Sequence, residues 1–196
     1  LIKQLQDNKR FKVYVFITGM HNLKKFGSTW EVLKQDKIKN MFRFNNQKIG
    51  DSMDVILAKT IIGFGNFVKK IKPDLIVIHG DRVETLASAI VGSLNNFKTA
   101  HIEGGEVSGT IDEILRHSIS KLSHIHFVTN RTARDRLTQG IYLSEDENDS
   151  TGCLEDAFAK VLVAEPIERR LKASQHIKPD LQSYQQWIDD LVAIRM

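Results

Sequence analysis

The feature that most restricts the fold is the apolar run LIVIH at residues 75–79, which ends in Gly80. A continuous apolar run of this length is typical of a strand that is buried on both faces of a parallel sheet. The small-residue stretch ETLASAIVGSL at 84–94 predicts a helix that can pack closely on such a sheet. Because parallel strands need crossover connections, which are usually helices, this pair of segments favours an α/β fold.

The same alternation extends over most of the chain before residue 140. We expect strands at 12–18, 75–79, 99–102 and 124–129, and helices at 51–72, 84–94, 112–123 and 131–139. Strands that alternate with helices through short loops imply right-handed crossovers and a Rossmann-like, doubly wound parallel sheet. Ligands of such sheets bind at the carboxyl ends of the strands, so the polar residues there are the candidates for function.

The pattern changes near residue 140. Residues 144–151 (SEDENDST) are acidic, helical patterns follow them, and we expect no strand after Thr129. The formal net charge of +4 is uneven as well, because the first third of the chain is basic and the last third is acidic. We therefore predict an α/β domain at 1–140 and a separate acidic linker with an α-helical tail at 141–196.

The composition argues against several classes of protein. The single cysteine, Cys153, leaves no internal disulfide and fits a reducing, cytoplasmic setting. No apolar run reaches the roughly 18 residues of a membrane span, and the basic residues lack interleaved aromatics, so neither a membrane nor a nucleic-acid partner is predicted. His124 and His126 are spaced like metal ligands but have no third ligand nearby, so we predict no metal and no cofactor.

Ionisable residues gather where the predicted strands end. HGDR at 79–82 follows one strand, HIEGGE at 101–106 ends the next, and SGTIDE at 108–113 leads into a helix that carries Arg116 and His117. In a parallel sheet these segments project toward one edge. Several carboxylates, imidazoles and an arginine at one edge indicate acid–base chemistry on an anionic ligand.

Each of these residues also has a purely structural explanation. Asp81 and Asp112 could complement helix N-termini. Glu103 could form an ion pair with a neighbouring arginine, and His101 could be a core histidine that hydrogen-bonds to the backbone. Only the concentration of these residues in one region favours a functional site.

The sequence resembles the hydrolysing UDP-N-acetylglucosamine 2-epimerases over about residues 1–140. The blocks that carry the resemblance are TGMHNLKKFGSTWEVL (18–33), HGDRVETLASA (79–89), HIEGGEVSGTIDE (101–113) and RHSISKLSHIHF (116–127). The glutamate loop at 101–113 separates this branch from the related non-hydrolysing epimerases. The segment at 154–174 is faintly similar to the C-terminus of long bacterial acyl-CoA dehydrogenases.

The resemblance implies one half of a two-domain enzyme of the GT-B type. That family converts UDP-N-acetylglucosamine and water into N-acetylmannosamine and UDP, the first reaction of sialic and related nonulosonic acid biosynthesis. The first strand and the second domain of the family have no counterpart in this sequence. We therefore expect a truncated form with little or no activity of its own, which could form homo-oligomers as its relatives do.

The resemblance also assigns roles to single residues. Glu103 and Asp112 are expected to be the acid–base pair, Asp81 to orient the sugar, and His101 to be a further catalytic residue. The residues expected to contact the UDP-sugar are His21, Arg82, Arg116 and His117.

Three points remain open at this stage. The substrate could be UDP-N-acetylglucosamine or a di-N-acetylated 6-deoxy relative. The chain could instead be a non-catalytic binding or assembly module on the same scaffold. Titration with UDP and UDP-N-acetylglucosamine would distinguish this module from an enzyme. A sugar-nucleotide glycosyltransferase of similar architecture is disfavoured, because the glutamate loop at 101–113 and the helix that carries Arg116 and His117 match the epimerases.

Overall fold

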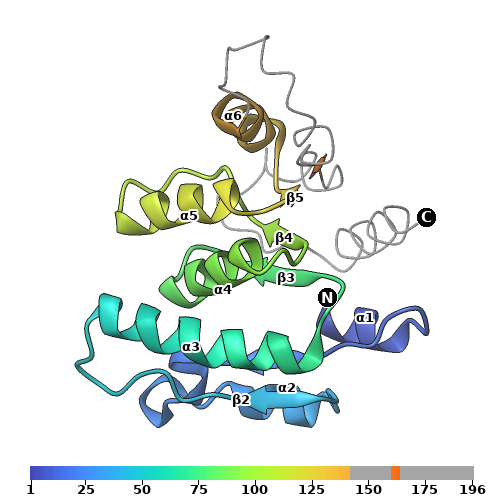
Figure 1. Cartoon of the computed structure of the whole chain (residues 1–196), viewed down its shortest axis with the longest axis vertical. Coiled ribbons are helices and arrows are strands. Elements are labelled where there is room, and N and C mark those ends of the chain that lie inside the picture. The colour runs from blue at the N-terminus through green and yellow to red at the C-terminus, as the bar shows by residue number, and fades with distance from the viewer. Residues whose placement is uncertain (142–159, 164–196) are drawn as a thin grey trace.

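The computed structural model describes residues 1–141 and 160–163 (Figure 1). Every strand pairing in this part of the chain is parallel. A two-stranded sheet joins β1 (Val15–Ile17) to β2 (Met41–Arg43), and a four-stranded sheet has the order β3 (Ile76–His79), β4 (Thr99–Ile102), β5 (Ile125–Val128) and β6 (Lys160–Val163). The predicted α/β class is confirmed.

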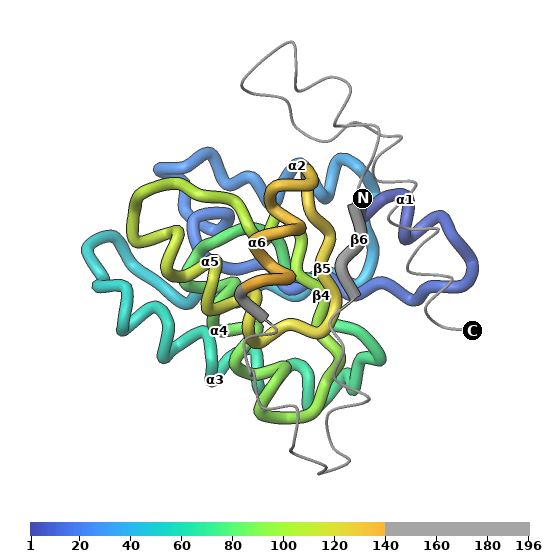
Figure 2. The backbone as a smooth tube through the Cα atoms, turned by 90° about the horizontal axis from the view of Figure 1, so that it is seen from above, coloured from blue at the N-terminus to red at the C-terminus, as the bar shows by residue number. Residues whose placement is uncertain are grey.

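The helices lie on both sides of the four-stranded sheet. In the part of the chain that the structure describes, the α-helices are α1 (Ile2–Asp7), α2 (Trp30–Gln35), α3 (Met53–Ile71), α4 (Val83–Leu94), α5 (Ile111–Lys121) and α6 (Arg131–Ile141), and 3₁₀ turns occupy Gly19–Asn22 and Lys24–Phe26. In Figures 1 and 2, α4, α5 and α6 lie on one side of β4 and β5, and α1 lies on the other. Within residues 1–141 and 160–163, no helix combines the length and the apolar character needed to cross a membrane.

Apolar clusters between the helices and the strands hold these layers together. On the α1 side, Leu5 packs against Ala100 of β4 and Phe127 of β5. On the other side, α3 and α4 pack on β3, and Ala89 of α4 is fully buried there. Gly92 of α4 leaves no room for a side chain against Thr99 of β4. The small residues of α4 therefore allow the close helix–sheet packing that their sequence predicts.

The prediction that no strand follows Thr129 is wrong. Lys160–Val163 form β6, which pairs with β5 in parallel so that Ile125 lies opposite Lys160. The sequence KVLV favours a strand, and the pairing satisfies backbone groups that β5 would otherwise expose at the edge of the sheet. The sheet thus extends beyond residue 140, whereas the acidic linker at 144–151 and most of the predicted helical tail lie outside the described residues.

The prediction that β3 is buried on both faces is also wrong. Ile76 and Ile78 are buried against the helices, whereas the side chain of Val77 is 37% exposed. The short helix α1 contacts β4 and β5 through Leu5, and β1 does not pair with β3. The face of β3 that carries Val77 is therefore only partly covered.

Candidate active site

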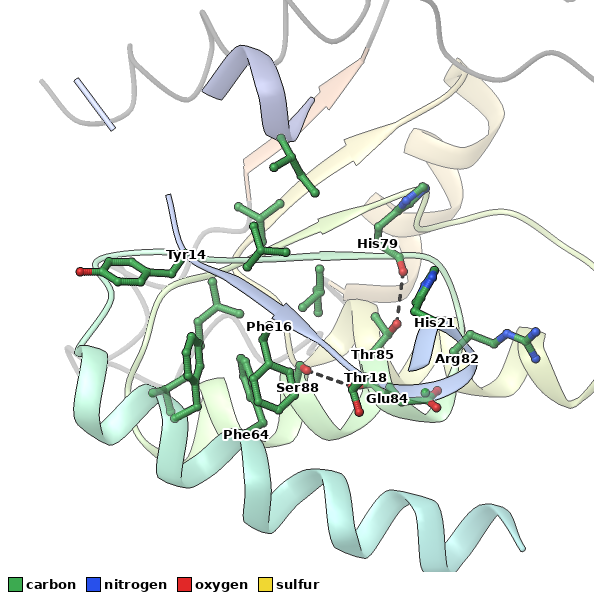
Figure 3. Close-up of a pocket in the computed structure, with 18 of the residues that line it drawn as sticks. Tyr14, Phe16, Thr18, His21, Phe64, His79, Arg82, Glu84, Thr85 and Ser88 are labelled. Carbon is green, nitrogen blue, oxygen red and sulfur yellow. Dashed lines mark hydrogen bonds between the residues drawn. The ribbon is translucent and has the colours of Figure 1, made fainter. Parts of the chain in front are cut away.

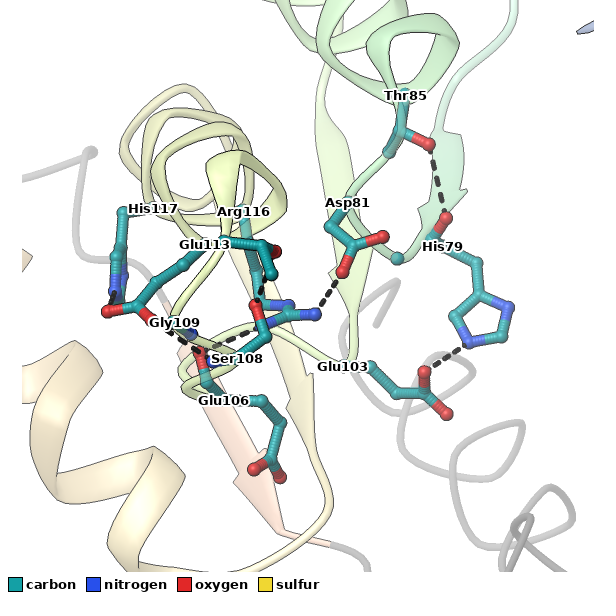
Figure 4. A network of polar contacts seen from close by, with 12 residues as sticks. His79, Asp81, Thr85, Glu103, Glu106, Ser108, Gly109, Glu113, Arg116 and His117 are labelled. Atoms are coloured by element: carbon teal, nitrogen blue, oxygen red, sulfur yellow. Dashed lines mark hydrogen bonds and ion pairs between the residues drawn. The ribbon is translucent and has the colours of Figure 1, made fainter.

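The carboxyl ends of β3 and β4 bring two acid–base pairs to one edge of the sheet (Figure 4). Glu103 directly follows β4, and its Oε2 lies 2.9 Å from Nε2 of His79, the last residue of β3. Asp81 lies in the turn between β3 and α4, and its Oδ2 accepts a hydrogen bond from Nη2 of Arg116 on α5. Each strand end thus holds one carboxylate beside one basic side chain.

Glu103 has an unusual backbone conformation and an ionised side chain. Its φ of 65° lies in the left-handed region, which is uncommon for a residue other than glycine, asparagine or aspartate. Its N–H donates to the carbonyl of Phe127 over 2.8 Å, which anchors this conformation to β5. The hydrogen bond from His79 lowers the pKa of Glu103, so the carboxylate persists at neutral pH. Strained backbone of this kind clusters at functional sites.

Arg116 fixes Asp81 to the loop that follows Glu103. The guanidinium side chain is only 11% exposed, and its Nη1 donates to the carbonyl of Glu106 over 3.0 Å while Nη2 holds Asp81. Loss of either charged partner would leave a largely buried charge uncompensated, which is costly. The pair therefore holds the Asp81 carboxylate in one orientation.

Glu113 organises the far side of the same loop. Its Oε2 accepts hydrogen bonds from the N–H groups of Ser108 (3.0 Å) and Gly109 (2.7 Å), and these bonds lower the pKa of Glu113. His117 Nε2 lies 3.7 Å from Glu113 Oε1, and Figure 4 shows this ring turned away from Asp81. The predicted substrate contact His117 is therefore next to Glu113 and not beside the two acid–base pairs.

His101 is buried beneath the site. Its ring nitrogens lie 2.8 Å from the carbonyl oxygen of Gly80 and 3.0 Å from Oγ of Ser120. Burial lowers the pKa of His101 to about 4, so the imidazole is neutral at physiological pH. The ring therefore connects the Gly80 turn to α5 from below, which is the arrangement of a core histidine.

The two buried histidines make stability depend on pH. Burial lowers the pKa values of His101 and His126 to about 4, whereas the unfolded chain binds protons near the ordinary value of 6.5. The unfolded state is therefore favoured as the pH falls below 6.5, and the loss is complete near pH 4. Between pH 7 and pH 5 we expect the free energy of unfolding to fall by about 2 kcal/mol per histidine in urea titrations.

Two variants test the source of this pH dependence. His126→Phe should remove about half of the decrease, because one titrating group is lost. His117→Gln, at a partly exposed position on α5, should retain it in full. A decrease that is the same in both variants would contradict the assignment to buried histidines.

The remaining predicted residues line a groove of about 2170 Å³ (Figure 3). His21 Nδ1 lies 2.6 Å from Thr29 Oγ1, and Arg82 lies beside Met20 of the same loop. Asp112 is in the first turn of α5, four residues before Arg116, and also lines the groove. Within the described residues, no hydrogen bond or ion pair links Asp112 to Asp81 or Glu103, and no group of three or more His, Cys, Asp or Glu could hold a metal ion.

Asn46 is a structural residue of the site that sequence reasoning missed. It is fully buried, its Oδ1 accepts the N–H of Gly19 over 2.9 Å, and its Nδ2 donates to Thr60 Oγ1 over 2.8 Å. These bonds fix the start of the loop that carries His21 to α3. Asn46 lies in the polar stretch NNQ, which gives no signal of burial in the sequence.

These strand-end residues fall within a known sequence family. The family model described as UDP-N-acetylglucosamine 2-epimerase matches residues 3–147. The chain belongs to the UDP-N-acetylglucosamine 2-epimerase family. The resemblance expected from the sequence is thereby confirmed. A second model, described as acyl-CoA dehydrogenase, C-terminal, bacterial type, matches residues 107–195 and agrees with the similarity noted at 154–174.

The chain spans less than two fifths of the length of the relatives compared by sequence here. A UDP-N-acetylglucosamine 2-epimerase of Neisseria meningitidis is 42% identical over 139 residues, 71% of this chain and 37% of that protein. A GDP/UDP-N,N'-diacetylbacillosamine 2-epimerase (hydrolyzing) of Campylobacter jejuni is 37% identical over 152 residues, 75% of this chain and 38% of that protein.

A solved structure of the epimerase family has the same fold. The crystal structure of UDP-GlcNAc 2-epimerase from Neisseria meningitidis bound to UDP-GlcNAc matches with a TM-score of 0.66 and 22% identity, over 88% of this chain and 45% of that chain. At this level of identity the match establishes the architecture, and the roles of single residues have to come from the site itself.

Proposed function

We propose that this chain carries the acid–base residues of a hydrolysing UDP-sugar 2-epimerase. In this reaction UDP-N-acetylglucosamine, or a di-N-acetylated relative, reacts with water to give the free 2-epimeric sugar and UDP. The observation that carries the proposal is the ionised Glu103 at the end of β4, one strand away from the Asp81–Arg116 pair. N-acetylmannosamine, the product from the first substrate, would then enter sialic acid synthesis.

The chemistry requires a base and a means of stabilising the leaving group. The hydrogen on carbon 2 of a sugar is barely acidic, so its removal has to be coupled to departure of the anomeric diphosphate. The C2–H bond and the C1–O bond to UDP break, a C1–C2 double bond forms, and UDP keeps the electron pair of the C1–O bond. Water then adds its oxygen to C1, and a proton returns to C2 on the opposite face.

The proposed roles follow from where each residue lies at the carboxyl ends of β3 and β4 or on the groove wall. Glu103 removes the proton from C2, because it is a carboxylate at the end of β4 that is ionised at neutral pH. Asp112, on the groove wall, acts as the second acid–base group and handles the incoming water. Asp81, held in one orientation by Arg116, accepts a hydrogen bond from a hydroxyl of the sugar.

Basic side chains near this edge of the sheet can stabilise an anionic leaving group. His21 and Arg82 line the groove and are proposed to contact the UDP-sugar, and Arg116 places a positive charge beside Asp81. For His117 we propose a positioning role: it lies beside Glu113, and Glu113 in turn accepts hydrogen bonds from the loop at 108–109. For His101 we propose a positioning role through its bond to Gly80.

A chimeric enzyme tests the proposed activity. Residues 1–139 would replace the matching segment of the meningococcal relative, which is 42% identical to this chain. The chimera is expected to release N-acetylmannosamine and UDP from UDP-N-acetylglucosamine, with deuterium at carbon 2 when the reaction runs in D₂O. Formation of UDP-N-acetylmannosamine without free UDP would overturn the hydrolysing assignment.

Calorimetric titration of the 196-residue chain separates catalysis from simple assembly. Weak but saturable binding of UDP-N-acetylglucosamine is expected, because the basic side chains that line the groove can contact a diphosphate. Failure of both UDP and UDP-N-acetylglucosamine to bind, together with an inactive chimera, would favour a non-catalytic module on this scaffold.

A further inference from the structure

The side chain of Glu106 ties the loop between β4 and α5 to the carboxyl end of β5. Its Oε1 accepts hydrogen bonds from Oγ1 of Thr129, which directly follows β5, and from Nδ2 of Asn130 over 2.9 Å. Figure 4 shows the Glu106 carboxylate turned away from the carboxylate of Asp81. Glu106 is therefore placed to hold the loop and not to share a ligand with Asp81.

The turn between β5 and α6 is a firm point of attachment. Asn130 Oδ1 accepts the N–H of Ala133 over 2.8 Å in the first turn of α6, while Nδ2 of the same amide donates to Glu106. Because the two ends of the amide are used in opposite senses, its orientation is fixed. Val128 and Ala133, on either side of this turn, are fully buried in one apolar cluster.

The backbone next to Glu106 is attached to α6 as well. Arg136 Nη1 donates to the carbonyl of Gly105 over 2.7 Å, and Gly105 packs on the backbone of Ala133 without room for a Cβ. Two successive residues of the loop thus contact the β5–α6 region. The position of the loop at 105–106 is set by α6, although α6 carries none of the proposed acid–base residues.

The carbonyl of Glu106 passes this attachment on to Asp81. Arg116 Nη1 donates to that carbonyl over 3.0 Å, and Nη2 of the same guanidinium donates to Asp81 Oδ2. Asn130, Glu106, Arg116 and Asp81 therefore form a connected series of hydrogen bonds that runs from the end of β5 to the turn after β3. Release of the Glu106 side chain would free its carbonyl to move, and the guanidinium would lose a fixed acceptor.

We propose that Glu106 is a positioning residue of the 2-epimerase reaction, which acts through Arg116 to hold the Asp81 carboxylate in its orientation toward the sugar. This inference rests on the proposed function. Because Asp81 is assigned to a sugar hydroxyl, loss of the Glu106 contact displaces the sugar and leaves the binding of UDP largely intact. A displacement of about 1 Å is enough to lower turnover about 10²-fold.

Asn130→Asp breaks the contact and keeps the helix cap. Aspartate retains the oxygen that accepts the Ala133 N–H, but it replaces the Nδ2 donor with an oxygen that repels the Glu106 carboxylate. In the chimeric epimerase we expect kcat to fall about tenfold to a hundredfold. Inhibition by UDP should stay within about threefold of the parent, because UDP lacks the sugar that Asp81 contacts.

A second substitution is expected to restore the contact. Glu106→Gln added to Asn130→Asp gives an amide that donates to the new carboxylate, so kcat should return to within about fivefold of the parent. Asn95→Asp is the matched control. Asn95 is exposed at the end of α4, and its Nδ2 donates to the carbonyl of Val91 over 2.8 Å. The same change there removes one comparable bond and should leave kcat within about twofold of the parent.

NMR of the 196-residue chain tests the link without any activity. A guanidinium held by two acceptors rotates slowly, so the Nη hydrogens of Arg116 should give separate, slowly exchanging signals. Asn130→Asp should average these signals, and Asn95→Asp should not. If Asn130→Asp fails to fold, Glu106→Ala, which removes the acceptor, takes its place in both experiments.

The outcomes separate this inference from the proposed function. An inactive parent chimera would reject the proposed function, and the Arg116 signals would still decide whether Glu106 holds Arg116. Unchanged signals or unchanged kcat in Asn130→Asp would overturn the positioning role. A parallel loss of kcat and of inhibition by UDP, or no recovery on adding Glu106→Gln, would show a general disruption of the loop and would overturn it too.

Discussion

Glu103→Gln is expected to lower kcat of the chimeric epimerase about 10²- to 10⁴-fold, the contribution typical of a general base. Glutamine has nearly the same shape and can still accept a hydrogen bond from His79, but it cannot take a proton from carbon 2. KM should therefore change little. Release of N-acetylmannosamine and of UDP, measured separately, reports the loss.

Glu31→Gln is the matched control for this substitution. Glu31 is exposed in the first turn of α2, so the same chemical change there should leave kcat within about twofold of the parent. A Glu103→Gln enzyme that retains full turnover would contradict the role of Glu103 as the base. A proportional rise in KM alone would point instead to substrate binding.

Gly105→Ala is expected to lower the free energy of unfolding by about 2–4 kcal/mol. Gly105 has a φ of 77°, and a Cβ there would overlap the carbonyl group of Ala133 in α6. Both the strained φ and the overlap with backbone have to be relieved by moving the loop away from α6. That movement would also weaken the 2.7 Å hydrogen bond from Arg136 Nη1 to the carbonyl of Gly105.

Gly109→Ala separates the two causes. Gly109 has a similar φ of 68° in the same loop, but no atom lies within 4 Å of the position a Cβ would take. Its substitution should cost only about 1 kcal/mol, the price of the left-handed conformation. Urea unfolding of both variants measures the difference. Equal destabilisation would show that contact with α6 does not require glycine at 105.

Local sequence patterns predicted most of the elements before residue 140. The apolar run at 75–79 became β3, and the long amphipathic pattern at 51–72 became α3, which ends at Ile71 and is followed by Lys72 as its C-cap and then by Pro73. Such patterns are legible because helix and strand periods repeat within about ten residues. The predicted strand at 12–18 contains β1, which is limited to Val15–Ile17.

The candidate site was predictable in part for the same reason. Polar residues that follow neighbouring parallel strands meet at one edge, so the segments holding Asp81 and Glu103 were expected to converge. The pairing of Glu103 with His79 and of Asp81 with Arg116 was not specified by that rule. The Asp81–Arg116 pair depends on where α5 lies along the sheet, which no local pattern records.

The sequence by itself thus determined the α/β class, the order of the elements before residue 140, and the edge at which the ionisable residues gather. Only the tertiary structure decided that β6 extends the sheet, that His101 lies beneath the site, and that Asn46 anchors the loop of His21. It also decided that β1 and β3 belong to two separate sheets in the described residues. The physical reason is that periodicity and turn chemistry act between near neighbours, whereas strand pairing and burial depend on contacts between segments far apart in the chain.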